Sequence, residues 1–181
     1  MKEGSDYLNF DSCVRKAESL LNTKDELLGL YIMTAIYTGL RIGDILELEW
    51  TFFDRDTFHL KEGKTQKDRT LTLNSSLKKH ASKVKKGRDG LVFVSQKGSV
   101  YATQSINTIL KRIFSKEVKS GKNISSHSLR KTFARHLYEQ NGQSEHILVM
   151  LSKILNHSSI PITRRYLGIT AEEIANIYLS L

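Results

Sequence analysis

The sequence predicts a mainly α-helical α+β domain with a small antiparallel β-hairpin at one edge. Apolar residues recur at helical spacing over most of the 181 residues. Between residues 57 and 73 the pattern changes to alternating apolar and polar residues, which is typical of half-buried strands. Hydrophobic residues make up 39% of the chain, enough for one core. Because no repeat or linker interrupts the pattern, we expect one domain over residues 1–181.

Composition favours a polyanionic partner and an intracellular location. The formal net charge is +9, although a merely basic solvated surface would give the same value. The single cysteine, Cys13, cannot form an internal disulfide, and its helical phase indicates a packing residue. The longest uncharged run, residues 27–40, is shorter than the roughly 18 residues of a membrane span. The polar first residues lack a signal-peptide pattern, so we expect a cytoplasmic protein without membrane contact.

The remaining elements follow from periodicity and from start and stop signals. Thr23 and Glu26 form a capping-box pattern, and Gly39 is a helix-ending glycine. The helix between them is apolar on nearly all sides, which predicts a central position in the core. We expect helices at about 11–21, 24–37, 77–84, 103–118, 143–155 and 170–181, and a short strand at 91–94. Residues 40–46 should turn into a further short helix that reaches about Leu48.

A further helix begins with the motif H-S-L-R-K-T-F. Ser126 or Ser128 can cap it, and Asn141-Gly142 is a good stop signal. His127 and Arg130 are three residues apart and therefore share one face at the positive N-terminal end. Free backbone N–H groups, an imidazole and a guanidinium group at this end predict a phosphate-binding site.

A histidine and a phenol follow the next apolar helix. His157 is nine residues before Tyr166, and Pro161 between them can start a short helix. The histidines are too far apart in sequence to indicate a metal site, and no carboxylates or cysteines accompany them. We therefore expect no metal or cofactor, and a phosphate site with a nearby phenol.

Arg41 and the lysines of the hairpin complete the set of candidates. Arg41 lies between two aliphatic residues at a turn, so it needs an anionic partner, which is either a substrate or Asp44. The hairpin tip carries Lys61, Lys64 and Lys67. Most loop lysines are simply solvated, so the spacing alone selects none of the three.

The motifs H-S-L-R-K-T-F, L-N-H-S-S and T-R-R-Y resemble the C-terminal active-site motifs of tyrosine recombinases, the site-specific DNA integrase family. T-G-L-R-I-G-D resembles the first arginine motif of that family, with Asp44 in its acidic supporting position. G-K-T-Q-K-D-R resembles the hairpin with the catalytic lysine, where alignment on the glycine selects Lys64. The resemblance spans about residues 10–178 and implies the tyrosine-recombinase fold. It implies the catalytic residues Arg41, Lys64, His127, Arg130, His157 and Tyr166.

The resemblance also implies the chemistry. Tyr166 would be the nucleophile that forms a 3′-phosphotyrosyl DNA intermediate. The arginines and His157 would bind the phosphate, His127 would handle the phenol proton, and Lys64 would protonate the leaving 5′-oxygen. The expected partners are double-stranded DNA and further protomers in a tetrameric synapse. Residues 170–181 either dock on a neighbouring protomer or pack on their own domain.

The sequence departs from the family pattern in two places. Asn156 stands where the family usually has glycine, and asparagine tolerates the left-handed backbone that the position requires. The N-terminal core-binding domain of the family is not recognised, so we expect a fragment of a longer protein or a truncated product. The alternatives are a type IB topoisomerase that relaxes supercoils, and a non-catalytic DNA-binding module. The second histidine motif and its short spacing to Tyr166 favour the recombinase.

Overall fold

A computed structural model describes residues 4–63, 66–95, 97–169 and 179. The chain divides into two compact units, Met1–Phe133 and Ala134–Leu181, and the division falls within α7 (Ser126–Gln140). One catalytic domain over residues 1–181 therefore stays a prediction. No helix in the described ranges is long and apolar enough to cross a membrane. The mainly helical class with a two-stranded antiparallel sheet is as predicted.

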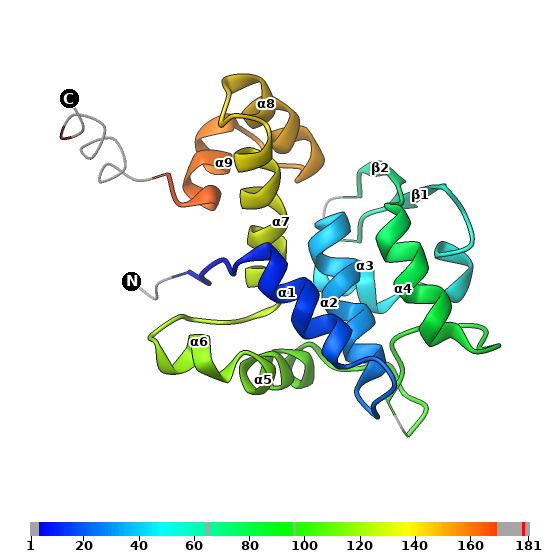
Figure 1. Ribbon diagram of the computed structural model, residues 1–181. Helices are drawn as coiled ribbons and strands as arrows, with labels where there is room; N and C mark the ends of the chain where they lie inside the picture. The colour runs from blue at the N-terminus through cyan, green and yellow to red at the C-terminus, as the bar shows by residue number, and fades with distance from the viewer. Residues whose placement is uncertain (1–3, 64–65, 96, 170–178, 180–181) are drawn as a thin grey trace. The chain divides into compact units, whose positions relative to one another are not determined.

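The first unit is organised around α2, against which α1 and α4 pack (Figure 1). Every residue of α2 except Leu27 and Tyr37 is buried, as the apolar sequence predicts. Helix α1 approaches so closely that a Cβ atom on Gly29 would lie 2.7 Å from the carbonyl oxygen of Ala17. Before α7, the elements of this unit are α1 (Phe10–Ser19), α2 (Glu26–Thr38), α3 (Ile42–Leu46), the 3-10 helix η1 (Trp50–Phe52), β1 (Thr57–Lys61), β2 (Asp68–Thr72), α4 (Ser75–Lys85), α5 (Thr103–Ile113) and α6 (Ser115–Lys119).

The capping box predicted at the start of α2 is wrong. The N-cap residue is Asp25, and its side chain makes no capping hydrogen bond. The Thr23 hydroxyl accepts the N–H of Asp25 instead, at 3.1 Å. The Glu26 carboxylate forms ion pairs with Lys86 at 2.8 Å and Arg88 at 2.7 Å, both from the segment after α4. Lys86 and Arg88, which are distant in sequence, therefore bind the Glu26 side chain that the local pattern assigned to the cap.

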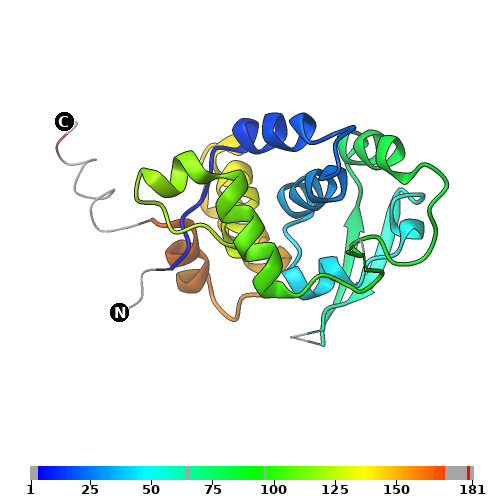
Figure 2. The same cartoon turned by 90° about the horizontal axis from the view of Figure 1, so that it is seen from below.

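The predicted hairpin is confirmed. Strands β1 and β2 pair antiparallel from Thr57 opposite Thr72 to Lys61 opposite Asp68, and Figure 2 shows both along their length. The predicted strand at 91–94 is wrong, because in the part of the chain that the structure describes this segment makes only isolated bridges. Leu91 pairs with Glu49 and Val94 with Val100, so the backbone changes partner within four residues.

The helix predicted at 103–118 is divided into α5 and α6. At Phe114 the backbone leaves the helical region, with φ −101° and ψ 39°, and the Phe114 side chain is only 1% exposed. The buried ring anchors this residue in the core cluster. Core packing therefore overrides a helical periodicity that would otherwise continue.

The second unit contains the end of α7 together with α8 (Glu145–Ile154) and α9 (Ile160–Leu167), which pack against each other. Each helix is followed by a left-handed residue, at Gly142, Asn156 and Gly168 with φ of 65°, 53° and 75°. The stop at Asn141-Gly142, the left-handed Asn156 and Pro161 in the first turn of α9 are all confirmed. The helix predicted at 170–181 lies outside the described residues, apart from the single position 179.

Candidate active site

Arg41 lies between the end of α2 and the start of α3. Gly39 ends α2 in the left-handed conformation, and Arg41 is the extended N-cap residue of α3. Leu40 is buried in the core, whereas the Arg41 side chain is 19% exposed. Its guanidinium group forms an ion pair with Glu62, at the end of the hairpin. The sequence considered a substrate or Asp44 as the partner and missed Glu62.

Glu62 is shared between two arginines. Its carboxylate is fully buried and also accepts a hydrogen bond from Arg69 of β2, with Nη1 and Oε1 3.3 Å apart. Arg69 is on the buried face of β2 beside Leu71, and its second nitrogen donates to the backbone carbonyl of Thr38. Burial lowers the pKa of Arg69 from its ordinary value, and the charge of Glu62 opposes that shift. Arg69 occupies an inward position in a strand whose residues alternate between buried and exposed, and this was the sequence signal for the ion pair.

Asp44 connects α3 to the tip of the hairpin. Its Oδ1 accepts the backbone N–H of Gly63 at 2.9 Å. The turn is closed by two further backbone bonds, from Gln66 to the Glu62 carbonyl at 2.8 Å and from Glu62 to the Lys67 carbonyl at 3.0 Å. The supporting position predicted for Asp44 therefore has a definite contact. Lys64 directly follows Gly63 but lies outside the described residues, so its selection stays a prediction.

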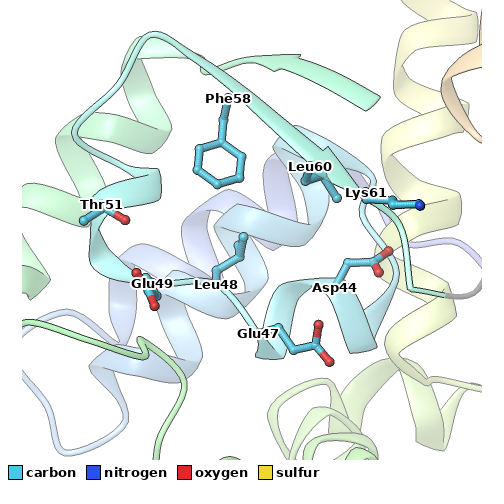
Figure 3. A pocket seen from close by; sticks show the side chains of 8 residues that line it. All are labelled: Asp44, Glu47, Leu48, Glu49, Thr51, Phe58, Leu60 and Lys61. Atoms are coloured by element: carbon cyan, nitrogen blue, oxygen red, sulfur yellow. The ribbon is translucent and has the colours of Figure 1, made fainter. Parts of the chain in front are cut away.

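A pocket of about 220 Å³ lies beside α3 and β1 (Figure 3). Three carboxylates and one lysine are its charged groups, which makes it unsuited to a phosphate. Asp44 projects into it, and within the described ranges its Oδ2 is buried without a hydrogen-bond partner. The lining residues are Asp44, Glu47, Leu48, Glu49, Thr51, Phe58, Leu60 and Lys61.

The N-terminal end of α7 differs from the prediction. Ser125 caps it, because its hydroxyl accepts the N–H of His127 at 3.2 Å. The Ser128 hydroxyl accepts the N–H of Ser125 in return, at 3.1 Å. The N–H of Ser126 donates to the side chain of Asn107 at 2.8 Å. These N–H groups are thus engaged within the protein, and the expectation of free ones at this end is wrong.

His127 and Arg130 differ in environment although they are close in sequence. His127 is exposed, whereas Arg130 is only 3% exposed and donates a hydrogen bond to the backbone carbonyl of Gly39. Phe133, one turn further along α7, lies so close to Gly39 that a Cβ atom there would be 2.3 Å from the ring. The contact between Gly39 and Arg130, which are 91 residues apart along the chain, therefore brings the two arginine motifs together at the end of α2.

In the second unit, His157 and Tyr166 lie side by side. The N–H of Asn156 donates to the Lys153 carbonyl and that of His157 to the Ser152 carbonyl, which ends α8 in a Schellman motif. The His157 and Tyr166 rings pack edge to face, with centroids 5.1 Å apart and planes at 70°. The nine-residue spacing from the sequence is thus realised as a direct ring contact.

Thr163 orients His157, and the sequence did not single it out. Its hydroxyl lies 2.9 Å from Nδ1 of His157, and its side chain is fully buried. Thr163 is three residues before Tyr166 in α9, so both side chains are on the same face. The helical spacing was a signal that could have identified it.

Comparison with known proteins identifies the family. The Phage integrase family model matches residues 13–173. The chain is 29% identical to the tyrosine recombinase XerD of Oceanobacillus iheyensis, over 97% of this chain and 61% of that protein. It is 31% identical to the probable integrase/recombinase YoeC of Bacillus subtilis, over 86% of this chain and 88% of that protein. The chain therefore spans less than two thirds of the length of XerD but most of the length of YoeC.

Solved structures share the fold. A crystal structure of XerA recombinase matches with a TM-score of 0.73 and 22% identity, over 99% of this chain and 66% of that chain. XerH recombinase bound to a palindromic difH substrate, a post-cleavage complex, matches with a TM-score of 0.69 and 21% identity, over 97% of this chain and 53% of that chain. With a family model matching nearly its whole length, the chain belongs to the phage integrase family.

Proposed function

We propose that this chain is the catalytic part of a tyrosine-type site-specific recombinase, which cuts and rejoins duplex DNA through a 3′-phosphotyrosyl intermediate. The observation that carries the proposal is the contact between Tyr166 and His157, with His157 held in turn by Thr163. Within a phage integrase family member, a phenol beside an oriented imidazole supports the role of Tyr166 as the nucleophile.

In this proposal the arginines bind the phosphate. Guanidinium groups stay charged at any working pH and can hold two phosphate oxygens at once, which suits Arg41 and Arg130. Positive charge on the non-bridging oxygens stabilises the negative charge that develops in the transition state. His157 adds a hydrogen bond to the same phosphate.

Cleavage then proceeds by direct displacement. The Tyr166 oxygen attacks phosphorus, so that a bond from phosphorus to the phenolic oxygen forms while the bond to the 5′-oxygen breaks. His127 takes the phenol proton, and Lys64 protonates the departing 5′-oxygen. A phenol has an ordinary pKa of about 10, so neighbouring cations are needed to favour its ionised form. A 5′-hydroxyl of another strand reverses the step, which rejoins the DNA without an external energy source.

The proposed partners are duplex DNA and further copies of the protein, assembled as a tetramer on DNA in the bacterial cytoplasm. The net charge of +9 and the DNA-bound XerH structure support the choice of DNA. We propose that residues 170–181 contribute to this assembly by docking on a neighbouring protomer. A chain ending at Gly168 should then assemble less on DNA than the full chain in gel filtration and synapsis assays, and equal assembly would contradict the docking role.

Trapping the covalent intermediate tests the function whatever the target sequence is. The full chain is incubated with nicked duplexes that carry randomised sequences, and denatured samples are searched for protein–DNA adducts. Wild type and the exposed control Tyr7→Phe should form adducts, whereas Tyr166→Phe should form none. No adduct with wild type, or an adduct that persists in Tyr166→Phe, would overturn the assignment. Supercoil relaxation without joining of two DNA molecules would favour the topoisomerase instead.

A further inference from the structure

We propose that Glu62 is a positioning residue for Arg41, and that Arg69 keeps their ion pair from cancelling the charge that Arg41 offers to a phosphate. The inference rests on the proposed function of Arg41. It gives roles to Glu62 and Arg69, two residues that the resemblance did not place in the catalytic set.

The two oxygens of Glu62 hold two arginines in different environments. Oε2 pairs with Arg41, and Oε1 pairs with Arg69. The carboxylate between them is fully buried, the side chain of Arg41 is 19% exposed, and that of Arg69 is 7% exposed. One guanidinium group therefore retains access to solvent, and the other is enclosed.

Charge explains why two arginines are needed. A buried carboxylate is costly unless it is paired, so Glu62 needs at least one cation. With Arg41 alone the pair would be neutral and would attract a phosphate weakly. Arg69 supplies the second positive charge, and its bond to the Thr38 carbonyl holds it inside the fold. The three side chains of Glu62, Arg41 and Arg69 together carry one net positive charge, and Arg41 is the one of the two arginines that solvent reaches.

The same contact fixes Arg41 relative to the hairpin. Glu62 is bonded to Lys67 across the turn, and the next residue, Gly63, is bonded to Asp44 of α3. Arg41 is the N-cap residue of that helix. Glu62 and Gly63 of the hairpin therefore bind Arg41 and Asp44, which belong to one short segment at the start of α3. Arg41 loses its rotamer freedom on folding rather than on binding a phosphate, which is the basis of preorganised catalysis.

The test uses the full chain and nicked duplexes recovered from the adduct assay. It measures the rate of adduct formation at saturating DNA separately from DNA affinity. Glu62→Gln keeps the size of the side chain but removes its charge, and we expect the rate to fall about tenfold to a hundredfold while affinity changes by less than about threefold. Glu47→Gln makes the same charge change at an exposed residue of the adjacent segment and should react at the wild-type rate.

Two double variants separate positioning from a purely structural role. Glu62→Gln/Arg69→Gln removes one charge of each sign, so the fold is spared an unbalanced buried charge, and it should remain as slow as Glu62→Gln. Arg41→Ala/Glu62→Gln should be no slower than Arg41→Ala. A wild-type rate of adduct formation in Glu62→Gln/Arg69→Gln would overturn the proposal. So would a rate in Arg41→Ala/Glu62→Gln that is lower than in Arg41→Ala by the full effect of Glu62→Gln.

Guanidinium NMR of the DNA-free protein gives a readout that does not depend on catalysis. Rotation of the Arg41 guanidinium group should be slow in wild type and faster in Glu62→Gln. Unchanged rotation in Glu62→Gln would overturn the positioning role even if the enzyme is active. Failure of wild type to form any adduct would instead overturn the proposed function, and the NMR comparison would still decide whether Glu62 holds Arg41.

Discussion

The guanidinium group of Arg130 donates a hydrogen bond to the backbone carbonyl of Gly39, the left-handed residue that ends α2. Arg69 donates to the adjacent carbonyl of Thr38. The last turn of α2 contains no basic residue of its own, so two arginines from distant segments satisfy carbonyls at the negative end of the helix. Arg41 follows two residues later, and its position therefore depends on α7 as well as on the hairpin.

Arg130→Ala should destabilise the first unit as well as impair DNA cleavage. Removing a buried, charged hydrogen-bond donor should lower the free energy of unfolding by about 1.5 to 3 kcal/mol. Urea denaturation measures this loss. Arg112→Ala is the control, since Arg112 is exposed and pairs with Asp25 at 3.4 Å, and it should cost less than about 0.5 kcal/mol. Equal losses in the two variants would contradict the role of the Gly39 contact.

Gly39→Ala should be one of the most destabilising small substitutions in the chain. The backbone has φ 59°, and the new Cβ atom would lie 2.3 Å from Phe133, so we expect a loss of about 2 to 5 kcal/mol. Gly87→Ala isolates the backbone effect, because φ is 78° and no heavy atom lies within 4 Å, and it should cost about 1 to 2 kcal/mol. Denaturant unfolding of both variants, and of Gly39→Ala/Phe133→Leu, separates the two effects. No recovery in the double variant would exclude the clash.

The left-handed Asn156 should accept glycine but not a β-branched residue. With φ 53°, Asn156→Gly should change stability by less than about 1 kcal/mol, whereas Asn156→Val should cost about 1 to 2 kcal/mol. Thermal unfolding measures both. Because His157 follows directly in the Schellman motif, Asn156→Val should also slow adduct formation. A fully active and stable valine variant would refute this account of the turn.

Thr163→Val should alter His157 without removing it. The substitution deletes the hydroxyl that lies 2.9 Å from Nδ1, so the imidazole loses the contact that sets its orientation and tautomer. We expect adduct formation to slow about tenfold and the ¹⁵N shifts of the ring to change. Thr163→Ser retains the hydroxyl and should keep wild-type shifts. Identical spectra for all three proteins would exclude the orienting role.

Acid should weaken the first unit through Glu26. The hydrogen bond from Lys86, together with Arg88, holds the pKa of this carboxyl below its ordinary value, although burial opposes the shift. Its stabilisation is therefore complete above the unfolded-state pKa of about 4.3 and is lost as pH falls through the lower folded-state pKa. The Tm difference between wild type and Glu26→Gln should be largest near neutral pH and should shrink below about pH 4. A constant difference across this range would contradict the assignment. Lys86→Met should reproduce part of the loss at neutral pH.

Local patterns in the sequence predicted the elements well where neighbouring residues decide the outcome. The hairpin, the buried α2 and the stops at Gly39 and Gly142 all follow from periodicity or from a single glycine. Two of the failures occurred where distant residues compete. Glu26 forms ion pairs with Lys86 and Arg88 instead of the predicted capping contact, and the core position of Phe114 interrupts a continuous helical pattern.

The candidate site divides in the same way. The sequence predicted a phenol near His157, and the structure brings the rings of His157 and Tyr166 into contact across one helix end and one short helix. The partners of the arginines depend instead on tertiary packing, since Arg41 meets Glu62 across 21 residues and Arg130 meets Gly39 across 91. Spacing along a chain cannot specify such contacts. They depend on which buried charges and carbonyl groups the packed core brings together.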